Sequence, residues 1–143
     1  MLTKISLLIM RIGTGALLFI WGHVRVVGGR GEGLANKYYG GMASEATLQA
    51  AFGWFEIALG LLVMLGLFRK YTLIGSAVIL VGGAFAIWRH FLDPFGRYLH
   101  EDANILFFPS LTVAGAAMAL IALREMDTLA LDRLLVKKGV STE

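Results

Sequence analysis

The chain contains no cysteine, and this absence excludes a whole group of sites. Without thiols there can be no disulfide, no thiol relay, no cysteine-bound zinc and no cysteine-ligated iron–sulfur cluster. Charged residues are also scarce, at 16% of 143 residues, whereas a soluble domain usually carries about a quarter. The 13 basic residues exceed the 10 acidic ones only slightly, and they are not interleaved with aromatic residues. We therefore expect no nucleic-acid partner.

Apolar sequence is abundant instead, with 57% hydrophobic residues and a mean hydropathy of +0.72. A helix crosses a bilayer with about 20 apolar residues, because each adds about 1.5 Å and the hydrocarbon layer is about 30 Å thick. Four segments meet this requirement, and they predict one all-α domain, a four-helix transmembrane bundle in contact with membrane lipids. They are residues 5–24, 48–68, 71–88 and 105–123, followed by a tail, 124–143, in which Asp127 is expected to cap a short amphipathic helix.

Basic residues set the expected orientation of these spans. Eight of them fall on the side that holds both termini and the 69–70 turn, and five fall on the other side. This bias predicts that both termini of the membrane-integral chain lie in the cytoplasm. The eight are Lys4, Arg11, Arg69, Lys70, Arg124, Arg133, Lys137 and Lys138, and the five are Arg25, Arg30, Lys37, Arg89 and Arg97.

The signature Ile-Trp-X-His ends both the first and the third predicted span. Trp21 and His23 carry it first, and Trp88 and His90 repeat it 67 positions later. The second and fourth spans end similarly, in LGLFRK and LIALRE. A duplicated helical hairpin would produce this pattern, and so would the ordinary preference of tryptophan for membrane interfaces.

Glu56 is the acid that lies inside a predicted span. Gly53 and Gly60 flank it at i−3 and i+4, and small residues mark helix–helix contacts in a bilayer. We therefore expect Glu56 to point into the bundle, where it must be protonated or paired. The other acids, Asp93 and Asp127 among them, are expected in loops or tails where water solvates them.

Arg11 is the matching base, and it shares its helix face with Gly15 and Gly22. It is expected either to point into the bundle or to extend its head toward the inner surface. On the third span, a face of small residues leads to His90, which should look inward above Glu56. This face comprises Gly75, Gly82 and Ala86.

Two kinds of site are consistent with these residues. A proton-linked site would use Glu56 as a buried acid and His90 as a group that titrates near neutrality. A metal site would use imidazole and carboxylate ligands suited to copper, iron or zinc, and a haem held by His23 and His90 is a further alternative. The metal candidates are His23, His90, His100, Glu101 and Asp102.

Four stretches of the sequence together form a pattern that can be compared with known families. They are LLIMRIGTGALLFIWGHVRVVGG, WFEIALGLLVMLGLFRKYTLIGSAVIL, WRHF and TLALDRLLVKK. In order and spacing, over nearly the whole chain, they resemble the DoxX/DoxD family of small four-span bacterial and archaeal membrane proteins. By position, Arg11, Glu56 and His90 are the family-like polar residues. The resemblance implies a protein integral to a prokaryotic cytoplasmic membrane. It also implies a quinone-linked redox setting, in which some members look like subunits of thiosulfate:quinone oxidoreductase. The glycine-rich first loop and the stretch YLHEDANILFFP depart from the family pattern.

We therefore expect a DoxX-like membrane subunit of a quinone-linked oxidoreductase, with electrons supplied by partner subunits. Glu56 and His90 would bond the quinone headgroup or pass protons, and further residues would hold the cofactor. Alternatives are a non-catalytic accessory subunit of a larger complex or a homo-oligomer, and a metal-binding membrane protein. The candidate cofactor-binding residues are Arg11, Trp54, Trp88 and Arg89.

Overall fold

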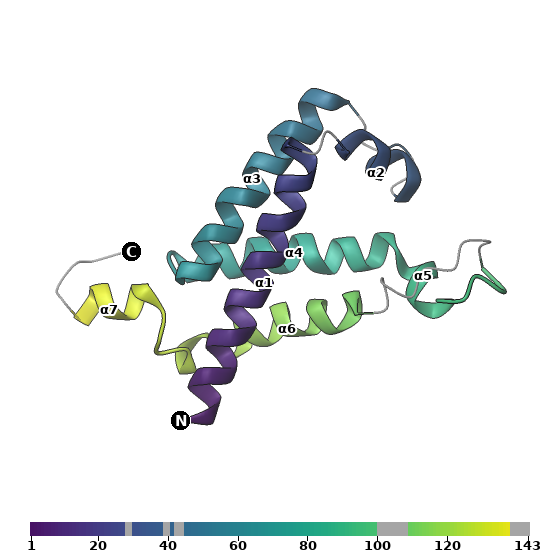
Figure 1. The fold of residues 1–143 in the computed structure, drawn as a ribbon. Helices are drawn as coiled ribbons and strands as arrows, with labels where there is room; N and C mark the ends of the chain where they lie inside the picture. Colours follow the sequence, from purple (N-terminus) through teal and green to yellow (C-terminus); the bar gives the residue numbers. More distant parts are fainter. Residues whose placement is uncertain (28–29, 39–40, 42–44, 100–108, 138–143) are drawn as a thin grey trace.

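The structure, a computed structural model, describes residues 1–27, 30–38, 41, 45–99 and 109–137. Within these ranges the chain forms helices joined by turns and contains no β-strand, which confirms the all-α prediction (Figure 1). The helices are α1 (Leu2–Val26), α2 (Gly31–Tyr38), α3 (Ala46–Leu65), α4 (Arg69–Ala86), α5 (Trp88–Leu92), α6 (Ser110–Ala122), the short 3-10 helix η2 (Arg124–Met126) and α7 (Leu131–Lys137).

The four long helices fall where the spans were predicted. By length and composition, α1 and α3 are able to cross a membrane. Helix α4 has 18 residues but begins with Arg69 and Lys70, and α6 is a shorter apolar helix of 13 residues. The start of the fourth predicted span, at Ile105, lies outside the described residues. Four membrane crossings therefore stay a prediction.

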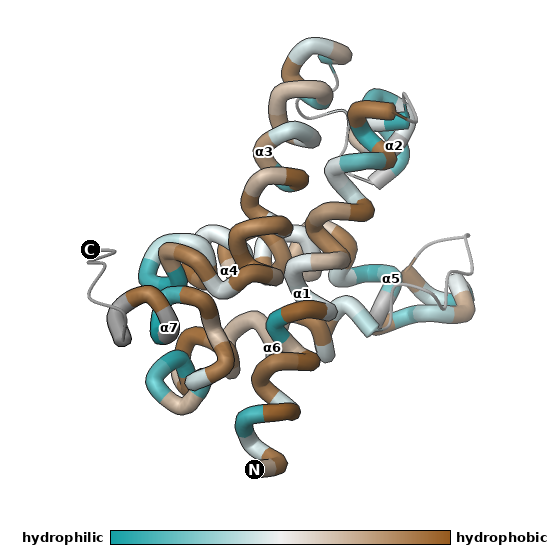
Figure 2. The backbone as a smooth tube through the Cα atoms, turned by 60° about the vertical axis from the view of Figure 1, so that its left-hand side comes forward, coloured by the Kyte–Doolittle hydropathy of each residue, from teal (hydrophilic) through white to brown (hydrophobic). Residues whose placement is uncertain are grey.

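The long helices are arranged as two pairs. Helix α1 packs mainly against α3, and α4 packs mainly against α6. Figure 1 shows the α1–α3 pair crossing the α4–α6 pair steeply, and Figure 2 shows the same separation into pairs from another side. The pairing is the one that a duplicated hairpin requires.

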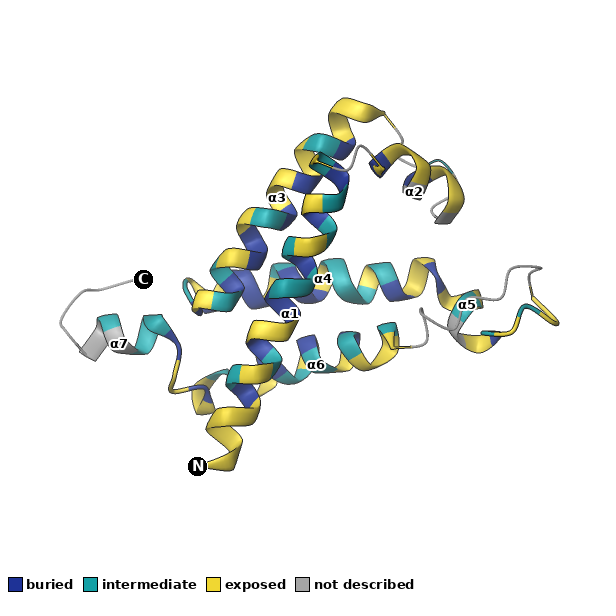
Figure 3. Ribbon diagram, in the orientation of Figure 1, coloured by how far each residue is buried: buried dark blue, intermediate teal, exposed yellow. Residues whose placement is uncertain are grey.

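A small apolar core lies where the two pairs meet. All four long helices contribute to it, and Figure 3 shows their buried sides turned toward one another. Around this core the helices carry many exposed apolar side chains, which is expected of surfaces that face lipid. The core residues are Leu7, Leu18, Leu59, Val63, Leu73 and Leu120.

Glycines allow α1 and α3 to approach closely. A methyl group added to Gly15 would lie 2.6 Å from the carbonyl oxygen of Gly60, and one added to Gly53 would lie 2.9 Å from that of Gly22. Buried residues on both helices recur at alternating steps of four and three, the spacing of an antiparallel coiled-coil seam. On α1 these are Arg11, Gly15, Leu18, Gly22 and Arg25, and on α3 they are Gln49, Gly53, Glu56, Gly60 and Val63.

Two local features differ from the sequence-based expectations. Between the first two predicted spans, where no helix was predicted, residues 31–38 form α2, whose Ala35 is fully buried. The third predicted span ends earlier than expected, because Ile87 leaves the helical conformation with φ −105° and ψ 22°. The chain then starts α5 at Trp88.

Candidate functional site

A buried ion pair joins α1 to α3 near one end of their seam. The Arg25 Nε donates to Glu56 Oε2 at 2.8 Å, and its Nη1 donates to Gln49 Oε1 at 2.5 Å. Glu56 is only 3% exposed. The Arg25 guanidinium also lies over the Phe52 ring, 5.1 Å from its centroid, a cation–π distance. We call Arg25, Gln49 and Glu56 the outer triad.

The helical repeat explains why these three side chains meet. Gln49 and Glu56 are seven residues apart, so they lie on one face of α3, and Gly53 lies between them against α1. Arg25 follows Gly22 by three residues on the opposing face of α1. The close approach of the two helices at these glycines therefore brings Arg25 within hydrogen-bond distance of Gln49 and Glu56. A charge pair buried in this way is costly to break, because removal of one member leaves the other without compensation.

At the opposite end of the seam, Arg11 is buried rather than extended toward the surface. Its Nε lies 2.9 Å from Asp127 Oδ2. Its Nη1 donates to the carbonyl oxygens of Val63, at 3.3 Å, and Met64, and its Nη2 donates to that of Leu129 at 3.2 Å. Val63 and Met64 are in the last turn of α3, where the carbonyl ends of the helix favour a nearby cation. Arg11 therefore caps α3 and binds the tail.

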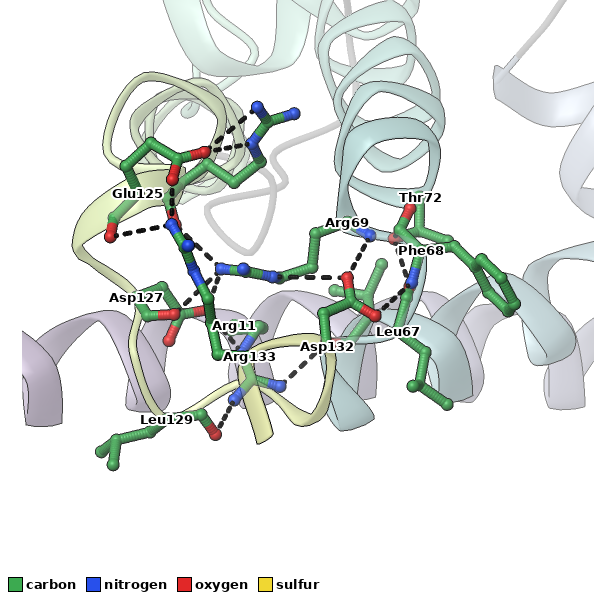
Figure 4. A network of polar contacts seen from close by, with 12 residues as sticks. Arg11, Leu67, Phe68, Arg69, Thr72, Glu125, Asp127, Leu129, Asp132 and Arg133 are labelled. Carbon is green, nitrogen blue, oxygen red and sulfur yellow. Dashed lines mark hydrogen bonds and ion pairs between the residues drawn. The ribbon is translucent and has the colours of Figure 1, made fainter. Parts of the chain in front are cut away.

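Arg69 fixes the tail from the other helix pair (Figure 4). Its Nη1 donates to the carbonyl oxygens of Arg124, at 2.8 Å, and Asp127, at 2.9 Å. The same guanidinium lies 3.7 Å from Asp127 Oδ2 and 3.5 Å from Asp132 Oδ2. Burial lowers the pKa of the Arg69 guanidinium from its ordinary value, and the carboxylates of Asp127 and Asp132 oppose that shift.

Asp132 completes this arrangement at the turn between α3 and α4. Gly66 makes the turn with φ 70°, a conformation that glycine adopts without strain. The Asp132 carboxylate then accepts hydrogen bonds from the backbone N–H groups of Phe68, at 3.0 Å, and Arg69, at 2.9 Å, and so caps α4. We call Arg11, Arg69, Asp127 and Asp132 the tail clamp.

Two acids are buried where water was expected to solvate them. Asp127 is 1% exposed and was predicted to cap a tail helix, but it lies between Arg11 and Arg69 instead. Asp93 is 4% exposed, because its carboxylate accepts backbone hydrogen bonds from its own loop. The two acids are compensated in different ways: backbone N–H groups bind the carboxylate of Asp93, and the guanidinium groups of Arg11 and Arg69 form ion pairs with that of Asp127.

The remaining candidate residues are not gathered around Glu56. Figure 1 shows α5, which carries His90, at the far end of α4 and apart from α3. Trp88 and Arg89 are exposed on α5, with the Arg89 guanidinium 5.5 Å from the Trp88 ring. Trp54 is exposed on α3, on the side opposite the seam.

The metal candidates receive no structural support in the part of the chain that the structure describes. There, no group of three His, Asp or Glu side chains is close enough to hold an ion. His23 is exposed and stacks on Phe19, with ring centroids 6.3 Å apart. His100, Glu101 and Asp102 lie outside the described residues.

Sequence reasoning found Glu56 and Arg11 but missed their partners. Arg25 was available to pattern analysis, because it continues the spacing of Gly15, Leu18 and Gly22 beyond the predicted span. The tail partners of Arg11, Asp127 and Leu129, lie more than 100 residues away in the chain, and no periodicity links them to Arg11.

The geometry thus places two internally paired charge clusters at the two ends of a glycine-packed apolar helix pair. Comparisons of the chain with known protein families, with curated proteins and with solved structures all return no match, so the resemblance to the DoxX/DoxD family depends on the quoted sequence stretches alone.

Proposed function

We propose that the chain is an integral membrane subunit of a quinone-linked oxidoreductase complex, in the manner of the DoxX/DoxD family that it resembles. The observation that carries this proposal is the outer triad, a buried and hydrogen-bonded charge pair between two apolar helices. Ionisable groups within membrane helices are expensive and are usually retained for function. The exposed apolar side chains of all four long helices support the membrane placement.

The outer triad has donors that fit a quinone headgroup, whose two carbonyl oxygens accept hydrogen bonds. A guanidinium carries five N–H donors. The contacts of Arg25 with Glu56 and Gln49 use one on Nε and one on Nη1, which leaves others for a ligand oxygen. A bound quinone would supply the electron-accepting chemistry. Glu56 would hold or release the proton, and Arg25 would orient the headgroup.

A second candidate function is a non-catalytic accessory subunit that stabilises a larger membrane complex. The observation that favours it is that both buried charged residues with an expected role, Glu56 and Arg11, are already bound by other groups of the chain. Glu56 is bound by Arg25, and Arg11 is bound by Asp127 and by carbonyl oxygens. Such groups can serve the fold alone, because buried ion pairs are compatible with a purely structural role.

Glu56→Gln separates the two functions. Glutamine keeps an oxygen that accepts from Arg25 but has no ionisable proton. In complex purified from native membranes, the catalytic proposal expects quinone reduction to fall at least about tenfold, equivalent to about 1.4 kcal/mol in barrier, with all subunits still present. Glu125→Gln is the matched control, since Glu125 is exposed and outside the spans. Unchanged turnover in Glu56→Gln would leave the accessory function standing.

A further inference from the structure

The carboxylate of one buried residue organises the segment that follows α4. Its residues 88–99, here called the outer loop, comprise α5 and the turn after it. The buried carboxylate of Asp93 accepts hydrogen bonds from the backbone N–H groups of Arg97, at 3.0 Å, Tyr98, at 2.6 Å, and Leu99, at 2.8 Å. The N–H of Gly96 donates to the Asp93 carbonyl oxygen at 3.1 Å. The loop is therefore held in one shape from inside.

This ordered loop displays large apolar and aromatic side chains outward. Tyr98 is 87% exposed, the highest value among the aromatic side chains of the described residues. Exposed patches of this kind mark interaction surfaces, because burying them is favourable. The exposed side chains are Trp88, Leu92, Phe95, Tyr98 and Leu99.

Two cations are fixed on this aromatic surface. The Arg89 guanidinium lies over the Trp88 ring at 5.5 Å, and that of Arg97 lies over the Phe95 ring at 5.9 Å. In the described part of the chain, neither guanidinium forms an ion pair with a carboxylate. Both side chains are exposed, so their N–H donors are accessible to a ligand outside the described chain.

We propose that the outer loop anchors the protein in the headgroup layer of the membrane, where Arg89 and Arg97 bind lipid phosphodiester groups. The guanidinium fork matches the geometry of phosphate oxygens. Tryptophan and tyrosine are favoured at this depth, since their rings are apolar and their N–H or O–H groups are polar. The position also fits, because the loop continues directly from α4 (Figure 1). This inference depends on the membrane placement proposed above.

A lipid interface fits the loop better than a protein groove does. Its exposed aromatic side chains come both from α5 and from the turn that follows it, and not from one face of a single helix. The guanidinium groups of Arg89 and Arg97 lie beside them. A layer of headgroups above acyl chains satisfies apolar and cationic groups together, whatever their exact spacing.

Brominated phosphatidylcholine vesicles test this placement in the full chain. Trp21→Phe with Trp54→Phe leaves Trp88 as the sole tryptophan, since the chain has three. We expect its fluorescence to be quenched by bromine at shallow acyl positions. A second double variant, Trp21→Phe with Trp88→Phe, retains only Trp54 and reports on the depth of α3 in the same vesicles. If Trp54 is quenched and Trp88 is not, the anchor is wrong while the membrane placement holds. If neither is quenched, both are wrong.

The arginines are tested by binding of phosphatidylglycerol to detergent-solubilised protein, followed by native mass spectrometry. Each arginine near an anionic surface should contribute about fivefold in affinity. The double variant Arg89→Gln with Arg97→Gln should therefore weaken binding by about 25-fold. Arg30→Gln is the control, because Arg30 is also exposed and was placed on the same side by sequence. Equal affinities in the double variant and the control would overturn the phosphodiester contact.

Asp93→Ala tests whether the shape of the loop matters. It removes the three backbone hydrogen bonds but no exposed side chain. We expect bromine quenching of Trp88 to fall while that of Trp54 is unchanged. Full quenching of Trp88 in this variant would contradict a preformed anchor.

Discussion

Arg25 lies three residues beyond Gly22 on the buried face of α1, and that spacing brings its guanidinium to Glu56. Sequence alone presented Glu56 as an acid that is protonated or paired. The structure selects the paired state, since the two side chains are 2.8 Å apart and both are buried. A neutral substitution of Glu56 therefore also changes the surroundings of Arg25, and its effect on stability is compared with that of a substitution of Arg25 and of both residues together.

A double-mutant cycle measures this pair. Glu56→Leu alone should lower the free energy of unfolding by about 3–5 kcal/mol, because it leaves Arg25 buried without a counter-charge. Arg25→Leu alone should have a similar cost. With both substitutions the cost should be much smaller, since no uncompensated charge remains. Thermal unfolding in a fixed detergent gives the comparison. Additive losses in the double variant would show that the pair contributes no coupling.

At the scale of helices, glycine decides which faces come together. The glycines of the α1–α3 seam have no room for a methyl group, whereas Gly82 on α4 and Gly115 on α6 have no atom within 4 Å of the position a methyl would take. The first set permits a close backbone approach. The second set makes no such contact within the described chain.

Gly15→Ala and Gly115→Ala should therefore have opposite effects. The first places a methyl group against the backbone of α3, and overpacking of this kind typically costs about 1–3 kcal/mol. The second should be neutral or stabilise by up to about 1 kcal/mol, since alanine is the better helix former. Chemical unfolding in detergent and the helical circular dichroism signal report both. A loss in Gly115→Ala that matches Gly15→Ala would mean that α6 packs more tightly than described.

The positions of the long helices were predictable from the sequence, because each helix coincides with a predominantly apolar run of residues whose ends can be read locally. Helices α1, α3 and α4 begin and end within three residues of the predicted spans. The inward direction of Glu56 also followed, since flanking glycines mark its face. The partners of Arg11 and Arg69 did not follow, because they depend on where the tail folds back. Hydropathy carries no information on the docking of a charged segment onto distant helix ends.

At the scale of the whole molecule, the offset of the repeated signature is found again in the helix starts but not in the buried helix faces. Helices α1 and α4 begin at Leu2 and Arg69, which are 67 positions apart, as are the two Trp-X-His signatures. The buried faces do not correspond, however. The buried Leu18 of α1 matches Phe85 of α4, which is 72% exposed. Equivalent helices thus pack differently in the two pairs, and a common rotation relating the pairs stays a prediction.

The predicted orientation of the molecule is testable with reporter fusions. The basic residues place the turn at Lys70 and the end of the chain on the cytoplasmic side. Fusions after Lys70 and after Glu143 should both read cytoplasmic, and a fusion after Lys37 should read external. The tail clamp links the first two sites, because Asp132 caps α4 and binds Arg69. A periplasmic signal from the fusion after Glu143 would rule out the predicted topology with both termini in the cytoplasm.

The tail clamp is what joins the two helix pairs at one end of the molecule. Asp127 receives Arg11 from the α1–α3 pair and Arg69 from the α4–α6 pair, so one carboxylate compensates two buried guanidinium groups. Asp127→Asn keeps the shape but removes that charge, and we expect a loss of about 3–5 kcal/mol in unfolding free energy. Glu125→Gln, at an exposed ion pair in the same segment, should cost less than about 1 kcal/mol. Limited proteolysis locates the effect: cleavage within residues 128–137 should accelerate in Asp127→Asn and not in Glu125→Gln. Equal stability and equal cleavage in the two variants would show that the pairs are joined by their apolar core alone.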